Sequence, residues 1–114
     1  MSELRIHAAH ALLPEGLVAD RVVTVAGGRI TGIGPGTAAD ADRSAAIVAP
    51  AFVDIQINGG GGVQFNETPT VDALATVAAA ARQGGTAAIL PTFITAAGQS
   101  FRHALDAVAR ALDA

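Results

Sequence analysis

Hydrophobic and polar residues alternate through the first part of the chain, and this period of two predicts short strands. Residues 4–8 alternate in this way, and residues 17–25 are rich in β-branched side chains. The Gly27-Gly28 pair separates that second run from a third at residues 29–34. Two such runs joined by two glycines indicate a hairpin, because glycine adopts the positive φ angles of tight turns. Residues 34–44, which are mostly small or polar, are expected to form a loop.

The middle of the chain combines a strand, a run of glycines and a helix. Residues 51–58 are strand-like and lead into the glycine run at residues 59–62. A helix is expected to begin after Thr70, whose hydroxyl suits an N-cap, and to end at Gly84-Gly85. Its apolar face has helical spacing and consists of Val71, Leu74, Val77, Ala78 and Ala81.

The last part of the chain repeats this order, with a strand at residues 86–90 followed by a second amphipathic helix. The apolar side of that helix is predicted to consist of Phe101, Leu105, Val108, Ala109 and Leu112. Strand–helix–strand–helix after a strand-rich leader is typical of βαβα units. We therefore predict the α/β class, with residues 52–58 and 86–90 paired in parallel.

Composition narrows the functions open to this chain of 114 residues. Its 10 acidic and 7 basic residues give a net charge of −3, so no nucleic-acid partner is expected. Every basic residue is arginine, which excludes a Schiff-base lysine and a P-loop lysine. The absence of cysteine excludes thiolate nucleophiles and thiolate metal sites. No apolar stretch suits a membrane span or a signal peptide, so we expect no membrane partner and a cytoplasmic location.

Candidate chemistry gathers near the end of the predicted strand at residues 51–58. Strict alternation would put Asp54, Gln56 and Asn58 on one face of that strand. Strands of a covered parallel sheet are usually apolar on both faces, and ligands bind at their carboxyl ends. These polar residues therefore line a site, or lie on the solvent face of an antiparallel edge strand. Thr92 follows the next strand and is a further candidate for the site lining.

The glycine run and the three histidines give weaker evidence for a functional site. The glycine run does not match a dinucleotide fingerprint, because Gln64 stands where a further glycine is needed, so we expect a flexible turn that lets backbone segments pack closely. His7 and His10 lie three residues apart in a predicted strand, hence on opposite faces, and cannot chelate one ion together there. His103 lies in the last predicted helix and is expected to be exposed.

The segment PAFVDIQINGGGGVQFN at residues 50–66 resembles the N-acetylglucosamine-6-phosphate deacetylase family of the amidohydrolase superfamily. The segment GGTAAILPTFIT at residues 84–95 is similar to that family's second barrel strand and the loop after it. The resemblance covers only the N-terminal portion of such an enzyme. It implies that residues 1–48 belong to a small β-sandwich domain. Residues 49–114 would then be the first two βα units of a TIM-type barrel, which needs about 250 residues to close.

The resemblance also implies a chemistry: metal-dependent hydrolysis of an acetamido sugar phosphate to acetate and glucosamine 6-phosphate. In many amidohydrolases the first barrel strand carries a His-x-His metal pair, and Gln56 and Asn58 occupy those positions here. Amide oxygens are poorer ligands than imidazole for a zinc-like ion. We therefore expect Gln56, Asn58 and Thr92 to line the site without holding the metal.

The resemblance places the divalent metal's ligands and the catalytic residues on later strands. No metal and no catalytic residue are thus expected on this chain alone, which we expect to be inactive. An amino sugar phosphate substrate and a homo-oligomer are expected for the complete enzyme. The alternative is a truncated, non-catalytic remnant that acts as an oligomerising interaction module. The sequence leaves open which of the two applies, the exact sugar and the roles of the three histidines.

Overall fold

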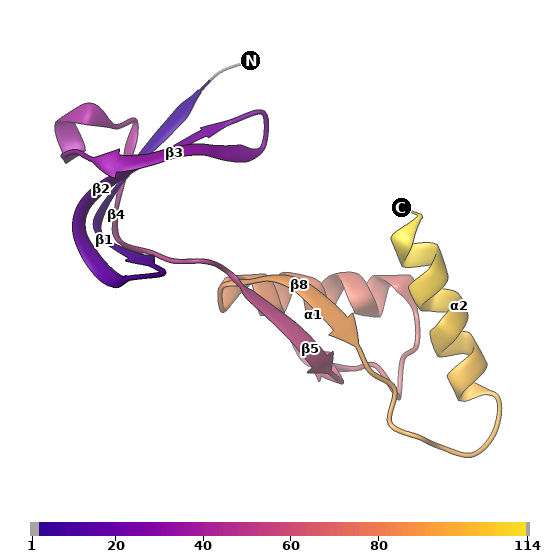
Figure 1. Cartoon of the computed structure of the whole chain (residues 1–114). Helices are drawn as coiled ribbons and strands as arrows, with labels where there is room; N and C mark the ends of the chain where they lie inside the picture. Colours follow the sequence, from indigo (N-terminus) through magenta and orange to yellow (C-terminus); the bar gives the residue numbers. More distant parts are fainter. Residues whose placement is uncertain (1–2, 114) are drawn as a thin grey trace. The chain divides into compact units, whose positions relative to one another are not determined.

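The computed structural model describes residues 3–113, which form a mixed α/β chain consisting mostly of strands (Figure 1). The chain divides after Pro50 into two compact units. The first unit has one sheet and the second has two small ones, and each unit has its own buried residues. Both α-helices of the described residues belong to the second unit.

The first unit is a single four-stranded sheet in the order β3-β2-β1-β4. Its strands are β1 (Leu4–Leu13), β2 (Gly16–Ala26), β3 (Arg29–Pro35) and β4 (Arg43–Val48). The predicted hairpin is confirmed: β2 and β3 pair antiparallel, and Gly27 and Gly28 have φ angles of 59° and 74°. Glycine suits both positions, since a side chain is strained at such angles. Ala8, Ala11, Val22 and Val23 are the buried apolar residues of this sheet.

The expectation of a loop across residues 34–44 is wrong at its carboxyl end. A short 3₁₀ helix, Ala38–Asp40, follows Thr37, and β4 begins at Arg43. β4 pairs in parallel with β1, and the Asp42 carboxylate accepts a hydrogen bond of 2.8 Å from the backbone N–H of Arg5. Only Arg43 and Ser44 of β4 are polar, and the strand extends back to them because they pair with Ile6 and His7 at the free edge of β1.

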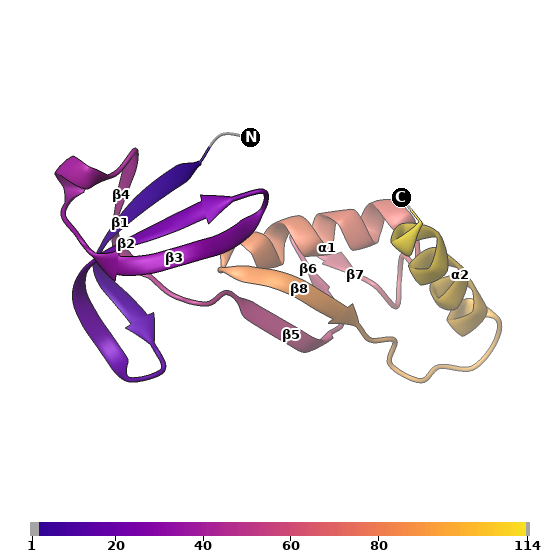
Figure 2. The same ribbon diagram turned by 45° about the horizontal axis from the view of Figure 1, so that its top comes forward.

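The second unit is built on two parallel strands, β5 (Phe52–Ile57) and β8 (Thr86–Pro91), which confirms the predicted pairing. Helix α1 (Val71–Gln83) connects them and packs against β8, as Figures 1 and 2 show. A small hairpin of β6 (Gly59–Gly60) and β7 (Val63–Gln64) lies against α1 (Figure 2). Helix α2 (Ser100–Leu112) follows β8 and also contacts α1.

Helix α1 begins and ends where its sequence predicts. The hydroxyl of Thr70 accepts a hydrogen bond of 3.2 Å from the backbone N–H of Ala73, which satisfies one of the free N–H groups of the first turn. At the other end Gly84 is the C-cap, and Gly85 follows it with a φ of 89°. The predicted cap and stop are therefore confirmed.

The side of α2 that packs overlaps the predicted apolar side only at Val108. Ala104 and Ala107 are buried with Phe65 and Leu74, whereas Leu105 is 63% exposed. Phe93, Val108 and Ala111 add to this cluster from its edge. Small alanine side chains let α2 approach α1 closely, which leaves the larger apolar residues Phe101, Leu105 and Leu112 on the surface.

The pairing of β5 with β8 is irregular where its polar residues lie. The register of β5 against β8 shifts between Asp54 and Ile57, and the carboxylate of Asp54 accepts a hydrogen bond of 3.0 Å from the backbone N–H of Gln56. Such an irregularity turns the side chains that follow it. The three polar residues also differ in burial: Asp54 and Asn58 are half-buried, whereas Gln56 is exposed.

Candidate functional site

The carboxyl ends of β5 and β8 meet at a pair of polar residues. Asn58 follows β5, Thr92 follows β8, and both are half-buried. The side-chain Nδ2 of Asn58 donates to the backbone oxygen of Thr92 at 3.2 Å and to its Oγ1 at 2.9 Å. The backbone N–H of Thr92 in turn donates to the backbone oxygen of Ile57 at 2.9 Å. Two of the three residues predicted to line a site are thus in direct contact.

These bonds fix which way the Asn58 amide faces. A backbone oxygen only accepts hydrogen bonds, so the nitrogen of the amide must face Thr92. The Oδ1 atom of Asn58 is then the atom that can accept a hydrogen bond from a ligand. The Thr92 hydroxyl, which already accepts from Asn58, still has its own hydrogen to donate. The pair can therefore present an acceptor and a donor side by side.

Gln56 is not part of this pair. Its side chain is exposed on β5, ahead of the point where the two strands end. Thr95, three residues after Thr92, is exposed as well. The structure brings Asn58 and Thr92 together and leaves Gln56 as a separate surface amide.

The glycine run after Asn58 is a tight hairpin rather than a flexible turn. Gly59 and Gly60 form β6, while Gly61 and Gly62 make the turn with φ angles of 62° and 82°. A Cβ at Gly61 would lie 3.1 Å from the Cγ2 of Thr76 and 3.3 Å from the Cβ of Ala80. The expectation that glycine allows close backbone packing is confirmed, because a larger residue would press against α1.

Two residues near the pair were not among the predicted site residues. Phe65 is buried, and its ring packs edge-on against Phe93 with centroids 6.4 Å apart. Asn66 makes two hydrogen bonds to the backbone of Ile94. Neither contact could be found from spacing, since each joins residues 28 positions apart along the chain.

An open cavity of about 520 Å³ lies beyond Phe65, between the segment after β8 and α2. Its lining is mostly apolar and consists of Phe65, Pro91, Phe93, Thr95, Ala96, Gly98, Phe101, Ala104, Leu105 and Val108. This volume falls within the range of small-molecule sites.

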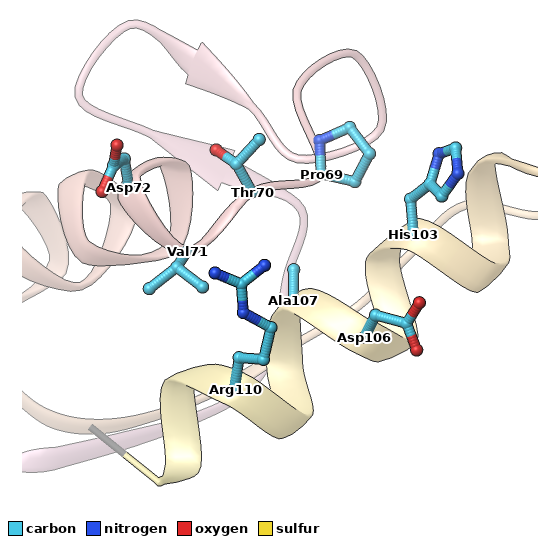
Figure 3. A pocket seen from close by; sticks show the side chains of 8 residues that line it. All are labelled: Pro69, Thr70, Val71, Asp72, His103, Asp106, Ala107 and Arg110. Carbon is cyan, nitrogen blue, oxygen red and sulfur yellow. The ribbon is translucent and has the colours of Figure 1, made fainter.

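A second pocket, of about 330 Å³, lies where the first turn of α1 faces α2 (Figure 3). Arg110 extends from α2 toward Val71, while the carboxylate of Asp106 points away from α1. His103 also lines this pocket and is exposed, as predicted. His103 belongs to this second pocket rather than to the lining of the cavity beside Phe65.

His7 and His10 lie in the first unit. His7 is buried in β1, and its Nε2 lies 3.2 Å from the Oδ1 of Asp20. Asp20 has a φ of 50°, which is uncommon for a residue other than glycine. His10 is exposed. The His7 contact explains how this buried imidazole is satisfied and indicates a structural role.

The described residues do not make a metal site. Between residues 3 and 113, no three His, Asp or Glu side chains cluster closely enough to hold an ion. The Asn58 nitrogen is held by Thr92, and the exposed Gln56 amide lies apart from the pair. These two amides do not supply the nitrogen or carboxylate donors that zinc prefers. The donor set of residues 3–113 therefore does not fit a zinc-like ion.

Comparison with known proteins supports the resemblance. A family profile described as the N-terminal domain of formimidoylglutamate deiminase HutF matches residues 4–45. The N-acetylgalactosamine-6-phosphate deacetylase of Shewanella sp. (strain ANA-3) is 50% identical over 62 residues, which is 54% of this chain and 16% of that protein. The enzyme of the same name from Escherichia coli O157:H7 is 30% identical over 106 residues, 92% of this chain and 28% of that protein.

A solved structure extends the likeness to the fold. It is a variant of the N-acetyl-D-glucosamine-6-phosphate deacetylase of Mycobacterium smegmatis in complex with N-acetyl-D-glucosamine-6-phosphate. The TM-score is 0.83 at 29% identity, and the match covers 99% of this chain and 30% of that one. The resemblance to the N-terminal portion of amino-sugar-6-phosphate deacetylases is thereby confirmed. The chain spans less than a third of the length of each of these three proteins.

Neither helix within the described residues is long and apolar enough to cross a membrane.

Proposed function

We propose that this chain supplies the N-terminal part of an enzyme that hydrolyses the acetamide of an N-acetylhexosamine 6-phosphate, releasing acetate and the amino sugar phosphate. In this proposal residues 1–48 belong to a small β-sandwich domain, and residues 49–114 begin a TIM-type barrel. The observation that carries the proposal is the match to the Escherichia coli O157:H7 deacetylase, which runs through both units and covers 92% of this chain.

The local geometry is compatible with such a substrate. Ligands of α/β barrels bind at the carboxyl ends of the parallel strands, where Asn58 and Thr92 meet. The free Oδ1 of Asn58 suits an N–H or O–H donor, and the Thr92 hydroxyl suits an acceptor. An acetamido sugar carries both kinds of group. We assign these two residues to the site lining and keep Gln56 as a weaker candidate, because its amide lies apart from the pair.

The identity of the sugar belongs to the proposal. The Shewanella relative is named for N-acetylgalactosamine 6-phosphate, and the Mycobacterium smegmatis structure is named for the glucosamine epimer. We propose a divalent, zinc-like metal for the complete enzyme, with ligands outside this chain. A homo-oligomer and a cytoplasmic location also stay predictions.

The test is an acetate-release assay on the protein purified as its source makes it, with its intact mass measured in parallel. Both N-acetylglucosamine 6-phosphate and N-acetylgalactosamine 6-phosphate are supplied, with and without added divalent metal. Release of acetate from either epimer supports the proposal, and the preferred epimer names the substrate. Failure with both epimers in metal-loaded protein would overturn it.

Exposed apolar side chains favour one alternative, a non-catalytic module that associates with copies of itself. Phe52, Val53 and Ile55 of β5 are 69%, 63% and 71% exposed, and Leu90 of β8 is 57% exposed. Apolar residues grouped on one small sheet are typical of a surface that another chain covers. An oligomer of native protein that releases no acetate would favour this alternative.

A further inference from the structure

Asn66 makes a paired contact with the segment that follows β8. Its Nδ2 donates to the backbone oxygen of Ile94 at 2.7 Å, and the backbone N–H of Ile94 donates to its Oδ1 at 2.8 Å. One side chain thus satisfies both backbone groups of a residue that lies beyond the last ladder position of β8, Pro91. A side-chain amide can make this exchange because it carries a donor and an acceptor on one planar group.

The residues that precede Asn66 and Ile94 along the chain, Phe65 and Phe93, are also in contact with each other. Phe65 packs edge-on against Phe93, with the ring planes at 84°, directly beside the Asn66–Ile94 contact. The backbone N–H of Phe65 donates to the backbone oxygen of Asn58 at 2.8 Å. Asn58 in turn donates to Thr92. These contacts close a ring that runs from Asn58 to Thr92, along the chain to Ile94, across to Asn66 and back through Phe65.

Burial does not hold Ile94 in place, since the residue is 60% exposed. Residues 95–99, which follow it, are exposed too. The Asn66 contact is therefore the last one that fixes this segment before the exposed loop that leads to α2. Without it, Thr92 keeps its bond to the Ile57 oxygen and Phe93 keeps its packing, but the backbone on the carboxyl side of Thr92 loses its last hydrogen bond and gains freedom.

We infer that Asn66 is a positioning residue of the site: it fixes residues 92–94 so that Thr92 orients the amide of Asn58. Asn66 acts on a substrate only through Ile94 and Thr92. For its effect on turnover, this inference rests on the proposed function. Its structural part, the link from Asn66 to the orientation of Asn58, stands on the contacts alone.

The experiment compares Asn66→Ala and Asn66→Asp with the parent in the native protein. Alanine removes both hydrogen bonds, whereas aspartate keeps the acceptor for the Ile94 N–H and loses the donor. Thr76→Val is the matched control, because it removes a side-chain-to-backbone bond of 2.9 Å to Asp72 within α1 and keeps the Cγ2 methyl that lies near Gly61. The measurements are amide hydrogen exchange at Ile94, the NMR signals of the Asn58 side-chain amide, and kcat and KM on the better epimer.

We expect Asn66→Ala to speed exchange at Ile94 by about tenfold, as the loss of one hydrogen bond implies. The Asn58 amide signals should move toward solvent values, and kcat should fall by about twofold to fivefold, no further than in Asn58→Ala, with a smaller change in KM. Asn66→Asp should keep exchange at Ile94 slow and recover part of kcat. Thr76→Val should match the parent in all three.

Two failures are distinguishable. If Ile94 exchanges faster in Asn66→Ala while the Asn58 signals and kcat stay at parent values, Asn66 only tethers a loop and the inference is wrong. If the parent protein releases no acetate from either epimer, the proposed function fails, and kcat and KM can no longer be compared between the variants. The Asn58 signals then decide alone: a shift in Asn66→Ala supports the inference, and unchanged signals overturn it.

Discussion

The side-chain amide of Asn58 donates to two oxygens of Thr92, one on its backbone and one on its side chain. The two residues are 34 positions apart and follow different strands, so the contact joins the carboxyl ends of β5 and β8. It also leaves the Oδ1 of Asn58 as the atom available to a ligand. The Nδ2 of Asn58 thus has a structural role, and its Oδ1 is the atom that faces a ligand. The exposed side chain of Gln56 makes no such structural contact with Thr92.

Asn58→Ala and Gln56→Ala should therefore differ in stability. Loss of the Asn58 amide leaves the Thr92 backbone oxygen without that donor, and should lower the free energy of unfolding by about 1–2 kcal/mol. Gln56→Ala should change it by less than about 0.5 kcal/mol, since this side chain is exposed. Urea unfolding followed by circular dichroism measures both. Equal losses would contradict the distinction.

Both substitutions should lower turnover modestly in the complete enzyme and leave its metal content unchanged, because neither amide is predicted to be a metal ligand. Metal analysis of the two purified variants checks this. Near-complete loss of metal in either variant would show that its amide is a ligand after all.

The double substitution Gln56→His with Asn58→His should raise the capacity of the complete enzyme for divalent metal. Imidazole is a better zinc ligand than an amide oxygen. The measurement is metal content after dialysis against a zinc buffer, with Gln56→Ala plus Asn58→Ala as the control. No gain over that control would mean that the other donors of a second site are missing.

Phe65→Ala should destabilise the second unit by about 3–5 kcal/mol, the usual effect of removing a buried phenylalanine. Phe65 is 2% exposed and is the fully buried aromatic residue of the cluster with Leu74, Ala104 and Ala107, against which Phe93 packs from the edge. Phe101→Ala, at a residue 45% exposed, is the control and should have a much smaller effect. A shift in the urea midpoint for Phe101→Ala as large as that for Phe65→Ala would contradict this account of the core.

Acid should destabilise the first unit through Asp40. Hydrogen bonds from the backbone N–H and the hydroxyl of Thr37 lower the pKa of the Asp40 carboxyl below its ordinary value. A lowered pKa in the folded state means that this contribution is complete above the ordinary value, about pH 4, and is lost as the pH falls through the lowered pKa.

Asp40→Asn removes this titration, so its stability should depend less on pH below about pH 4 than that of the parent. Chemical unfolding at a series of acidic pH values measures the difference. Glu15→Gln, which neutralises an exposed carboxylate of the same unit, is the control. Parallel curves for Asp40→Asn and the parent would refute the prediction.

The 114-residue chain by itself should release no acetate and should associate with itself. β5 and β8 form a two-stranded sheet whose outer edges are open to pairing, and Ile55 and Leu90 are exposed on it. Size-exclusion chromatography should show a smaller species after Ile55→Glu plus Leu90→Glu. Leu17→Glu, the same kind of change on the first unit, is the control. A monomeric parent chain with metal-dependent turnover would contradict both parts.

Local signals in the sequence determined several elements. The Gly27-Gly28 pair specifies its hairpin because glycine is favoured at positive φ, and Thr70 specifies the start of α1 because its hydroxyl satisfies a free N–H group. The order of strands and helices was enough to predict that β5 and β8 pair in parallel. Each of these inferences depends on neighbours within a few residues or on the strand–helix–strand order of a βαβ unit.

Only the tertiary structure decided the rest. β4 begins at the polar residues Arg43 and Ser44 because the edge of β1 is free, and α2 buries Ala104 and Ala107 because close helix packing favours small side chains. The contact between Asn66 and Ile94 joins residues 28 positions apart, which no periodicity encodes. The sequence by itself thus determined the types and order of most elements and the residues near the site. The tertiary structure decided which of those residues meet, because a hydrogen bond depends on where the fold places both of its partners.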